Sequence, residues 1–371
     1  MVETLFWFVL GLVALISGAE FVVRAASKLA GFFGVSRLVI GLTIVAFGTS
    51  APELAISLKA GLADQTDLMM GNIVGSNITN ILLIIGLTAL VLPLKVNTNL
   101  IRFDVPVMIA ISVLLFFFAL SGSITFVESA ILAFLLVVYL VYLGFHGKNP
   151  SVPLDAEKEK STPVLIFLYL VLGIAGLVLL INGAGWMVDS AIVLAQMAGV
   201  SELVIGLTIV ALGTSLPEVV TSLVAAFKGE RDIAVGSVVG SNILNILAVL
   251  GVSGLFIPEI NVQQSLITFD LWIMLAVSFA CLPIFFTGNR IARWEGVIFL
   301  GYYIAYMVYL FLSSAEHDAL NAYNSVMLYF VIPITILTVV VIVGYEFKKR
   351  WRFRNFRGFG AAIGDGDDGS E

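Results

Sequence analysis

Two short segments of the sequence place a glutamate directly after a proline, inside otherwise apolar surroundings. The segment Gly48-Thr-Ser-Ala-Pro-Glu53 recurs as Gly213-Thr-Ser-Leu-Pro-Glu218. Carboxylates inside apolar segments of membrane length are costly to bury, and they mark ion or proton sites. Together with neighbouring carbonyls and hydroxyls they form an all-oxygen donor set, which suits hard cations such as Ca²⁺ or Na⁺ and does not suit softer metals. The predicted chemistry is therefore reversible binding of a hard cation.

The proline indicates where the further oxygens come from. Pro52 has no amide hydrogen and collides with the carbonyl of Gly48, so an ordinary helix cannot continue through this point. Irregular backbone is tolerated within a membrane only where it lines protein or a cavity. We therefore expect free carbonyls around Ala46–Thr49. A harmless proline kink is the competing interpretation of one copy, but two copies that each carry a glutamate favour ligands.

A second motif, Gly75-Ser-Asn-Ile-Thr-Asn80, is mirrored by Gly240-Ser-Asn-Ile-Leu-Asn245. Ser76 and Asn80 are four residues apart, so their side chains share one helix face. Their neutral oxygens suit a monovalent cation such as Na⁺. Gly, Ser and Asn also serve as close-packing residues between membrane helices, and this is our interpretation of Asn77 and Asn242.

Both motifs belong to an internal duplication. Residues 36–58 align without a gap to residues 201–223, and 17 of the 23 positions are identical at a constant offset of 165. Residues 11–19 recur at 176–184 in the same way. The first apolar segment therefore belongs to the duplicated fold, and we interpret it as a membrane span and not as a cleaved leader.

The composition excludes a soluble globular domain. The chain is 60% hydrophobic and only 12% charged, which is typical of a membrane protein. Its one cysteine, Cys281, rules out an intrachain disulfide, and its two histidines lie at segment ends, which argues against a histidine metal cluster. No folded basic and aromatic surface for nucleic acid is indicated.

Apolar stretches of spanning length, about 20 residues each, predict eleven transmembrane helices. With the N-terminus outside, 18 of the 19 lysines and arginines fall on the inner side, and only Lys59 falls outside. This asymmetry indicates a multi-pass protein of the cell membrane with a cytoplasmic C-terminus. The expected spans are 3–23, 37–62, 68–93, 103–121, 125–145, 163–188, 202–227, 233–257, 268–287, 291–313 and 324–346.

An odd number of spans in each half inverts the second half relative to the first. Equivalent motifs then approach the middle of the bilayer from opposite faces. We expect an all-α polytopic membrane protein with two inverted five-helix repeats and an eleventh C-terminal transmembrane helix. Its segments are the first repeat (1–146), a cytoplasmic linker (147–162), the inverted repeat (163–313), the eleventh helix with its preceding outer loop (314–346) and a basic then acidic cytoplasmic tail (347–371).

These paired motifs resemble the Ca²⁺/cation antiporter superfamily, and most closely its prokaryotic sodium/calcium exchangers. The resemblance covers about residues 1–313, the ten-helix exchanger core. Proton/calcium exchangers of the superfamily typically carry Gly-Asn-x-x-Glu in place of Gly-Thr-Ser-x-Pro-Glu and match less well. Potassium-dependent members have an aspartate where this chain has Asn245, which argues against K⁺ co-transport.

The resemblance also implies a set of ion ligands. For Ca²⁺ it implies Glu53 and Glu218 with the backbone oxygens of Thr49 and Thr214. For Na⁺ it implies the carbonyls of Ala46 and Ala211 and the side chains of Ser50, Ser215, Ser76, Ser241, Asn80 and Asn245.

The function we expect is exchange of Na⁺ for Ca²⁺ by alternating access, electrogenic and independent of K⁺. No enzymatic activity and no resident cofactor are expected, because the ions are substrates; the other partner is the lipid bilayer, and a monomer suffices because both half-sites lie in one chain. The main alternative is exchange of H⁺ for Ca²⁺ or another divalent cation through the same two glutamates. A cation channel, and a membrane enzyme or sensor, are less favoured, because inverted repeats indicate alternating access and no nucleophile–base pair is visible.

Overall fold

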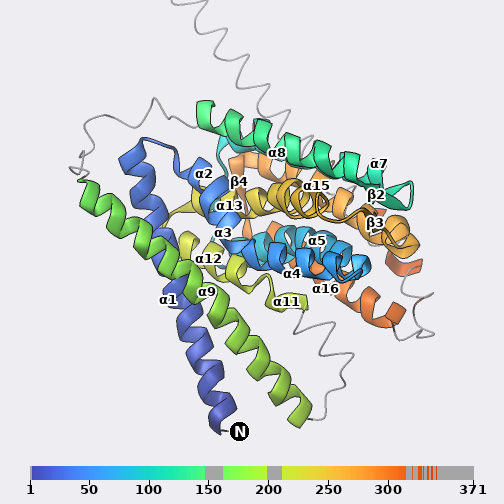
Figure 1. The fold of residues 1–371 in the computed structure, drawn as a ribbon, viewed down its shortest axis with the longest axis horizontal. Coiled ribbons are helices and arrows are strands. Elements are labelled where there is room, and N and C mark those ends of the chain that lie inside the picture. Colours follow the sequence, from blue (N-terminus) through green and yellow to red (C-terminus); the bar gives the residue numbers. More distant parts are fainter. Residues whose placement is uncertain are drawn as a thin grey trace, which may run out of the picture.

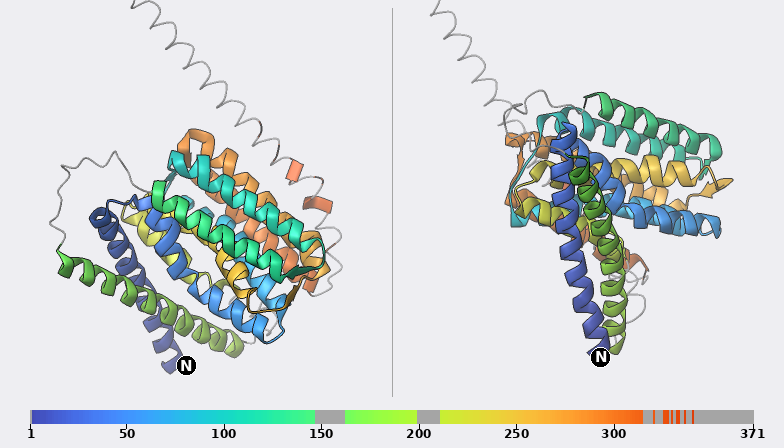
Figure 2. Two further views of the ribbon diagram at one scale, coloured as in Figure 1. Left: turned by 45° about the horizontal axis from the view of Figure 1, so that its top comes forward. Right: turned by 60° about the vertical axis from the view of Figure 1, so that its left-hand side comes forward.

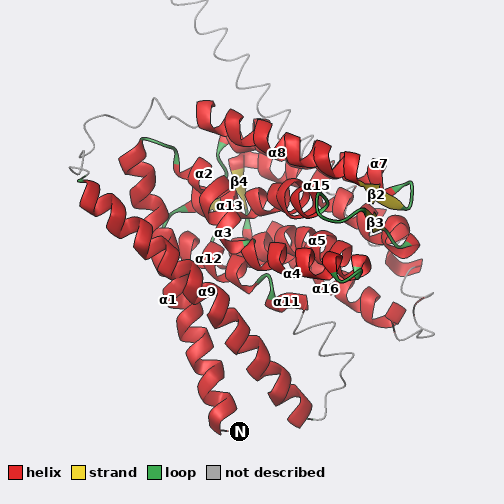
Figure 3. Cartoon of the chain, viewed as in Figure 1, coloured by secondary structure: helices red, strands yellow, loops and turns green. Residues whose placement is uncertain are grey.

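The computed structural model is a bundle of helices with two very short strand pairs (Figures 1 and 3). It describes residues 2–146, 162–198 and 211–314, together with a few residues between 320 and 340. The expected linker, most of the eleventh helix, the tail and the first part of the seventh span lie outside these described residues. The all-α class predicted from the sequence is confirmed.

The elements follow the same order in the two halves. In the first half they are α1 (Val2–Phe33), α2 (Arg37–Ile40), η1 (Gly41–Val45), α3 (Ala46–Thr49), α4 (Ala51–Leu62), α5 (Thr66–Thr79), η2 (Asn80–Ile85), α6 (Gly86–Val91), β1 (Leu94–Lys95), η3 (Leu100–Asp104), α7 (Val105–Ala119), β2 (Ser123–Thr125) and α8 (Phe126–His146). In the second half they are α9 (Pro163–Met197), α11 (Ala211–Gly213), α12 (Leu216–Phe227), α13 (Arg231–Leu244), η5 (Asn245–Leu250), α14 (Gly251–Ser253), β3 (Glu259–Asn261), η6 (Leu266–Asp270), α15 (Leu271–Phe286), η7 (Thr287–Asn289), β4 (Arg290–Ile291) and α16 (Arg293–Ser314). The segments η1, η2, η3, η5 and η6 are π-helical, and η7 is a 3₁₀ turn.

Among the described residues, eight helices are long and apolar enough to cross a membrane, and a bent helix pair makes a ninth. These nine match nine of the eleven expected spans. The expected span 202–227 is represented by its second part, the apolar helix α12. The eleventh span lies largely outside the described residues and stays a prediction.

The short strands join the two halves at their loops. β1 pairs antiparallel with β4, and β2 pairs antiparallel with β3. The loops of β1 and β4 are both on the predicted inner side, and the loops of β2 and β3 are both on the predicted outer side. Each pair therefore unites loops that an inverted arrangement places on the same face.

The β1–β4 pair also constrains the number of crossings between them. Two strands on one face require an even number of spans along the chain that connects them. Five spanning helices are described between Lys95 and Arg290. The count becomes even only if the stretch that contains α12 also crosses, as the sequence predicts.

Two spans, with the helices packed against them, form the centre of the bundle. The continuous span α13–η5–α14 has its most apolar stretch entirely buried, and for α5–η2–α6 the buried share is 78%. By contrast, the corresponding share is 11% for α9 and 17% for α16. η1 and α3 pack against α13, while α4 packs against α5. The segments that carry the two sequence motifs are therefore the core of the fold.

The helices α1 and α9 form an antiparallel pair along one side of this core (Figures 1 and 2). Glycines make their close approach possible. A Cβ atom added at Gly11 would lie 2.7 Å from the carbonyl oxygen of Gly183, and one added at Gly18 would lie 2.7 Å from that of Gly176. The two contacts are equivalent under the duplication, so the axis that relates the repeats passes between these helices.

This packing predicts opposite effects of the same substitution at two nearby glycines of α9. A Cβ added at Gly183 would meet the carbonyl oxygen of Gly11 at 2.8 Å, whereas one added at Gly185 would meet nothing within 4 Å. We expect Gly183→Ala to destabilise the protein by about 1–3 kcal/mol through overpacking. Gly185→Ala should leave stability unchanged or raise it, because alanine favours helix. Thermal unfolding of the purified variants in detergent checks this, and equal midpoints would contradict the close contact.

Candidate cation-binding site

The first glutamate motif lies where a membrane-spanning helix is broken. α3 ends at Thr49, α4 begins at Ala51, and the two parts are bent by 47°. Ser50 sits between them with φ −83° and ψ 7°, and Pro52 occupies the first turn of α4, where its missing amide hydrogen has no cost. Ser215 has nearly the same backbone, φ −86° and ψ 1°, between α11 and α12. The same local sequence therefore produces the same break in each half.

At the break, the C-terminal end of α3 and the N-terminal end of α4 meet around Ser50. The carbonyl end of α3 carries partial negative charge, which favours a cation. Glu53 and Glu218 lie in the first turns of α4 and α12. The positive N-terminal ends of these helices lower the cost of holding a buried carboxylate. A broken helix thus supplies both the anionic ligands and the dipoles that make them tolerable.

The two glutamates of the two repeats meet in the interior. Glu53 is 1% exposed and Glu218 is 3% exposed. They are close enough for their charges to repel one another. The hydroxyl of Ser50, from the first repeat, donates to Oε1 of Glu218, from the second, at 3.1 Å. The side chain of Thr49 also interacts with Glu218.

The second motif lies against the first. η2 begins at Asn80 and packs against α12, while η5 begins at Asn245 and packs against α4. Each of these two segments therefore packs against the helix that carries the glutamate of the other half. Both asparagines stand at the start of a π-helical segment, a local distortion that is frequent at functional sites.

Several of the predicted ligand oxygens are buried without a hydrogen-bond partner among the described residues. Buried oxygens normally have partners, because removing them from water otherwise costs free energy. A bound cation would supply the missing interaction. The five atoms are Oε2 of Glu53, Oε2 of Glu218, Oδ1 of Asn80, Oδ1 of Asn245 and Oγ of Ser241.

Other buried acids of the core are already satisfied by neighbours. Oδ1 of Asp104 accepts a hydrogen bond from the hydroxyl of Tyr139 at 3.1 Å. The equivalent Asp270 accepts one from Tyr306 at 2.8 Å. Oε2 of Glu295 accepts from the amide of Ala292 at 2.6 Å, at the start of α16. The glutamates of the repeated motif differ from these acids because each keeps one carboxylate oxygen unmatched.

The backbone oxygens differ in part from the expectation. The carbonyl of Ala46 was expected to be free, but it accepts from the amide of Ser50 at 2.9 Å and from the hydroxyl of Thr49 at 3.3 Å. The reason is that the chain bends at Ser50 and does not unwind, so α3 keeps its last hydrogen bonds. Thr214 is half-buried in the turn before α12, and of Ala211 only the backbone, in α11, is described. Ser76 and Ser215 are buried as expected.

One supporting residue was missed by the sequence reasoning. The side-chain amide of Asn72 donates to the carbonyl of Glu53 at 3.3 Å and to the hydroxyl of Ser57 at 2.9 Å. It thereby fixes the turn of α4 that carries Glu53. The duplication hides this residue, because the equivalent position in the second repeat is Ser237.

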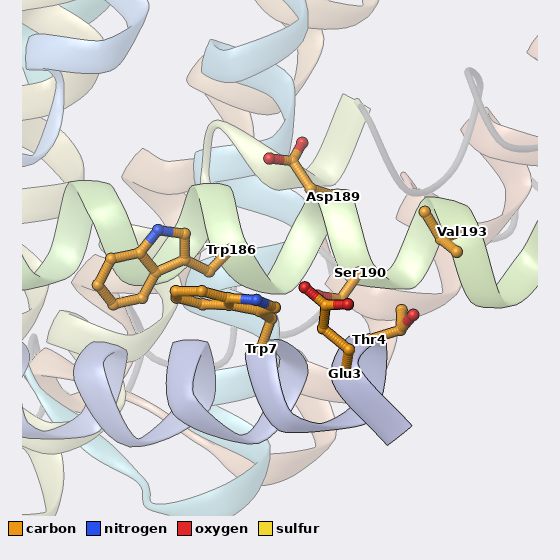
Figure 4. Close-up of a pocket in the computed structure, with 7 residues that line it drawn as sticks. All are labelled: Glu3, Thr4, Trp7, Trp186, Asp189, Ser190 and Val193. Carbon is orange, nitrogen blue, oxygen red and sulfur yellow. The ribbon is translucent and has the colours of Figure 1, made fainter. Parts of the chain in front are cut away.

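A separate groove of about 370 Å³ opens between the N-terminal end of α1 and the C-terminal end of α9 (Figure 4). Trp7 and Trp186 line it with ring centroids 5.5 Å apart, and Glu3 lies beside them. None of the predicted ligands lines this groove. Among the described residues, no group of three or more His, Cys, Asp or Glu side chains comes together. The buried oxygen cluster is therefore the candidate site.

Comparison with known proteins agrees with this geometry. The family model described as "Sodium/calcium exchanger protein" matches residues 3–145 and 168–312. The chain is 41% identical over 323 residues to a protein of Alkalimonas amylolytica named "Putative antiporter CaxA", with 84% of this chain and 100% of that protein covered. It is 36% identical over 343 residues to the sodium/calcium exchanger MaX1 of Methanosarcina acetivorans, with 81% and 97% covered.

The fold agrees as well. A solved structure of the sodium-calcium exchanger NCX_Mj, soaked with zero Na⁺ and Ca²⁺, superposes with a TM-score of 0.72 at 32% sequence identity and covers 83% of this chain and 99% of that chain. The resemblance found in the sequence motifs is thereby confirmed. The chain belongs to the sodium/calcium exchanger protein family, and it is a membrane cation antiporter whose substrates are the transported ions, and not an enzyme.

Proposed function

We propose that this protein exchanges Na⁺ for Ca²⁺ across the cell membrane by alternating access, electrogenically and without K⁺. The observation that carries the proposal is the cluster of buried oxygens in which one oxygen each of Glu53 and Glu218 has no hydrogen-bond partner in the described part of the chain. Two facing carboxylates balance the charge of one Ca²⁺, which offsets much of the cost of burying them. The same oxygens, taken together with neutral ones, also suit Na⁺.

The neutral oxygens favour Na⁺ over H⁺ as the counter-ion. Exchange of H⁺ requires only groups that bind a proton, and the two carboxylates would suffice. It gives no reason to bury three neutral oxygens that have no partner within the described ranges: Oδ1 of Asn80, Oδ1 of Asn245 and Oγ of Ser241. Na⁺ would bind these three oxygens, together with the hydroxyls of Ser50, Ser76 and Ser215 and the carbonyls of Ala46 and Ala211. Thr49 and Thr214 join the glutamates at Ca²⁺.

Three further parts of the proposal follow from charge and architecture. About three Na⁺ for each Ca²⁺, the ratio that the family resemblance implies, would move one net charge per cycle. The neutral Asn245 removes the carboxylate that K⁺-dependent exchange would use. The N-terminus lies outside, the two repeats (1–146 and 163–313) surround one site, and one chain is sufficient for transport.

The coupling ion is tested in proteoliposomes. Vesicles loaded with Na⁺ and diluted into Na⁺-free buffer with ⁴⁵Ca²⁺ should accumulate Ca²⁺, and equal Na⁺ on both sides should abolish uptake. A proton ionophore should leave the uptake largely intact. Uptake that ignores the Na⁺ gradient and collapses with the ionophore would establish the H⁺-coupled alternative instead.

Glu53→Gln should reduce this uptake to the background of empty vesicles, because it removes one of the two charges that balance Ca²⁺. The matched control is Glu259→Gln, which removes the same charge from an exposed side chain of β3. The control should keep its uptake within about twofold of the native protein, since exposed charges contribute little. Full Na⁺-driven uptake by Glu53→Gln would contradict the assigned site.

One set of vesicles tests both whether transport is electrogenic and whether it is independent of K⁺. Equal K⁺ on both sides should leave the initial rate of uptake unchanged, because no K⁺ is carried. Addition of valinomycin should then raise the rate, because it dissipates the potential that unequal charge movement builds up. Stimulation by K⁺ alone would show K⁺ co-transport, and indifference to valinomycin would show electroneutral exchange.

A stability measurement tests the mutual repulsion of the glutamates without transport. In chelator and without Na⁺, Glu218→Gln should unfold at a higher temperature than the native protein, because it removes one of two buried like charges. The native protein should be stabilised by added Ca²⁺, and Glu218→Gln should lose most of that shift. A lower midpoint in chelator for Glu218→Gln than for Glu259→Gln would contradict the arrangement.

A further inference from the structure

Two hydrogen bonds join the second motifs of the two repeats, and one of them involves Asn80. The side-chain amide nitrogen of Asn80 donates to Oδ1 of Asn242 at 2.9 Å. Both side chains are buried, with exposed fractions of 1% and 2%. The bond therefore links η2 of the first half to α13 of the second, next to the candidate site. Asn242 was interpreted from the sequence as a packing residue.

The direction of this bond decides what Asn80 can bind. A carboxamide has an oxygen at one end and an NH₂ group at the other, and only the oxygen can bind a cation. Because the nitrogen of Asn80 donates to Asn242, Oδ1 is the end left over. That oxygen is buried without a hydrogen-bond partner among the described residues. Reversal of the amide would direct two N–H groups to where a cation is expected.

Asn242 is itself held in one orientation. Its side-chain nitrogen donates to the backbone carbonyl of Asn77 at 3.4 Å and lies 3.6 Å from the sulfur of Met108. Both contacts involve acceptors, so they hold the nitrogen and leave Oδ1 of Asn242 toward Asn80. A polar chain thus runs from Asn77 and Met108 through Asn242 to Asn80.

The equivalent residues of the other half form only part of this chain of polar contacts. The nitrogen of Asn77, the counterpart of Asn242, lies 3.8 Å from the sulfur of Met274, much as Asn242 does from Met108. However, Oδ1 of Asn77 and Oδ1 of Asn245 both have no hydrogen-bond partner among the described residues. Asn80 is therefore oriented by a bond across the repeats, whereas Oδ1 of Asn77 accepts none.

We propose that Asn242 is a positioning residue that orients the side-chain oxygen of Asn80 toward a bound Na⁺. The inference rests on the proposed function, because it takes Asn80 to be a Na⁺ ligand. Asn242 acts through Asn80 and does not itself touch the ion. The two asparagines at the centres of the repeated motifs accordingly have different roles, although their sequence contexts are the same.

The test compares Asn242→Leu with Asn77→Leu, the same substitution at equivalent positions. Na⁺ and Ca²⁺ half-saturation are measured in the proteoliposome assay. For Asn242→Leu we expect the Na⁺ concentration at half-maximal effect to rise about fivefold, as for loss of one buried hydrogen bond. Its Ca²⁺ half-saturation should change by less than about twofold, because the glutamates hold Ca²⁺. Asn77→Leu should change the Na⁺ value by less than about twofold.

Three outcomes would overturn the proposal. They are an equal Na⁺ effect in both variants, an equal effect on both ions in Asn242→Leu, and no effect in Asn242→Leu. If a leucine variant does not yield folded protein, Asn242→Ser and Asn77→Ser replace the pair, because serine is small enough to fit and too short to reach Asn80. Native protein without Na⁺-dependent uptake would refute the proposed function itself, which keeps the two failures distinguishable.

Discussion

Two like charges held together inside an apolar protein are the constraint on which the rest of this structure depends. Glu53 and Glu218 are almost fully buried, and their charges repel each other whenever both are ionised. Such an arrangement is tolerable only if positive charge is supplied from nearby. The helix breaks supply part of it as the N-terminal ends of α4 and α12. A cation bound between them, as proposed for this antiporter, would be a further source.

The two halves of the molecule share the same order of main helices, but some of their side-chain contacts differ. Glu20 of α1 forms an ion pair with Lys228 at 2.9 Å, and Ser27 donates to Glu230 at 2.7 Å. The duplication places Gly185 and Ala63 where Glu20 and Lys228 would recur, so this ion pair has no counterpart at the other end. Within the described residues, the two ends of the α1–α9 pair therefore differ in their polar contacts with the rest of the bundle.

The sequence predicted the spans and the glutamate motifs because both depend on short local patterns, and because the duplication repeats those patterns. Apolar length, the Pro-Glu pairs and the constant offset were sufficient for the helical class, for most spans and for the meeting of Glu53 with Glu218. Features set by tertiary packing were not accessible. The carbonyl of Ala46 keeps its helical hydrogen bonds, although proline predicted a free oxygen. The roles of Asn72 and Asn242 were not predicted, because the internal duplication reveals only features that both halves share. The hydrogen bonds that Asn72 donates to the carbonyl of Glu53 and that Asn242 accepts from Asn80 have no equivalent at the corresponding described positions of the other half.

The strand pairs β1–β4 and β2–β3 are only a few residues long, yet each takes one strand from either half. They join the two halves at two places, which the predicted topology puts on opposite faces of the membrane. A rotation of one complete half against the other would break both strand pairs. The two halves therefore form a single scaffold. If the protein works by alternating access as proposed, movement would fall to the parts outside these strand pairs, above all the helix pair α1 and α9, which pack closely against each other.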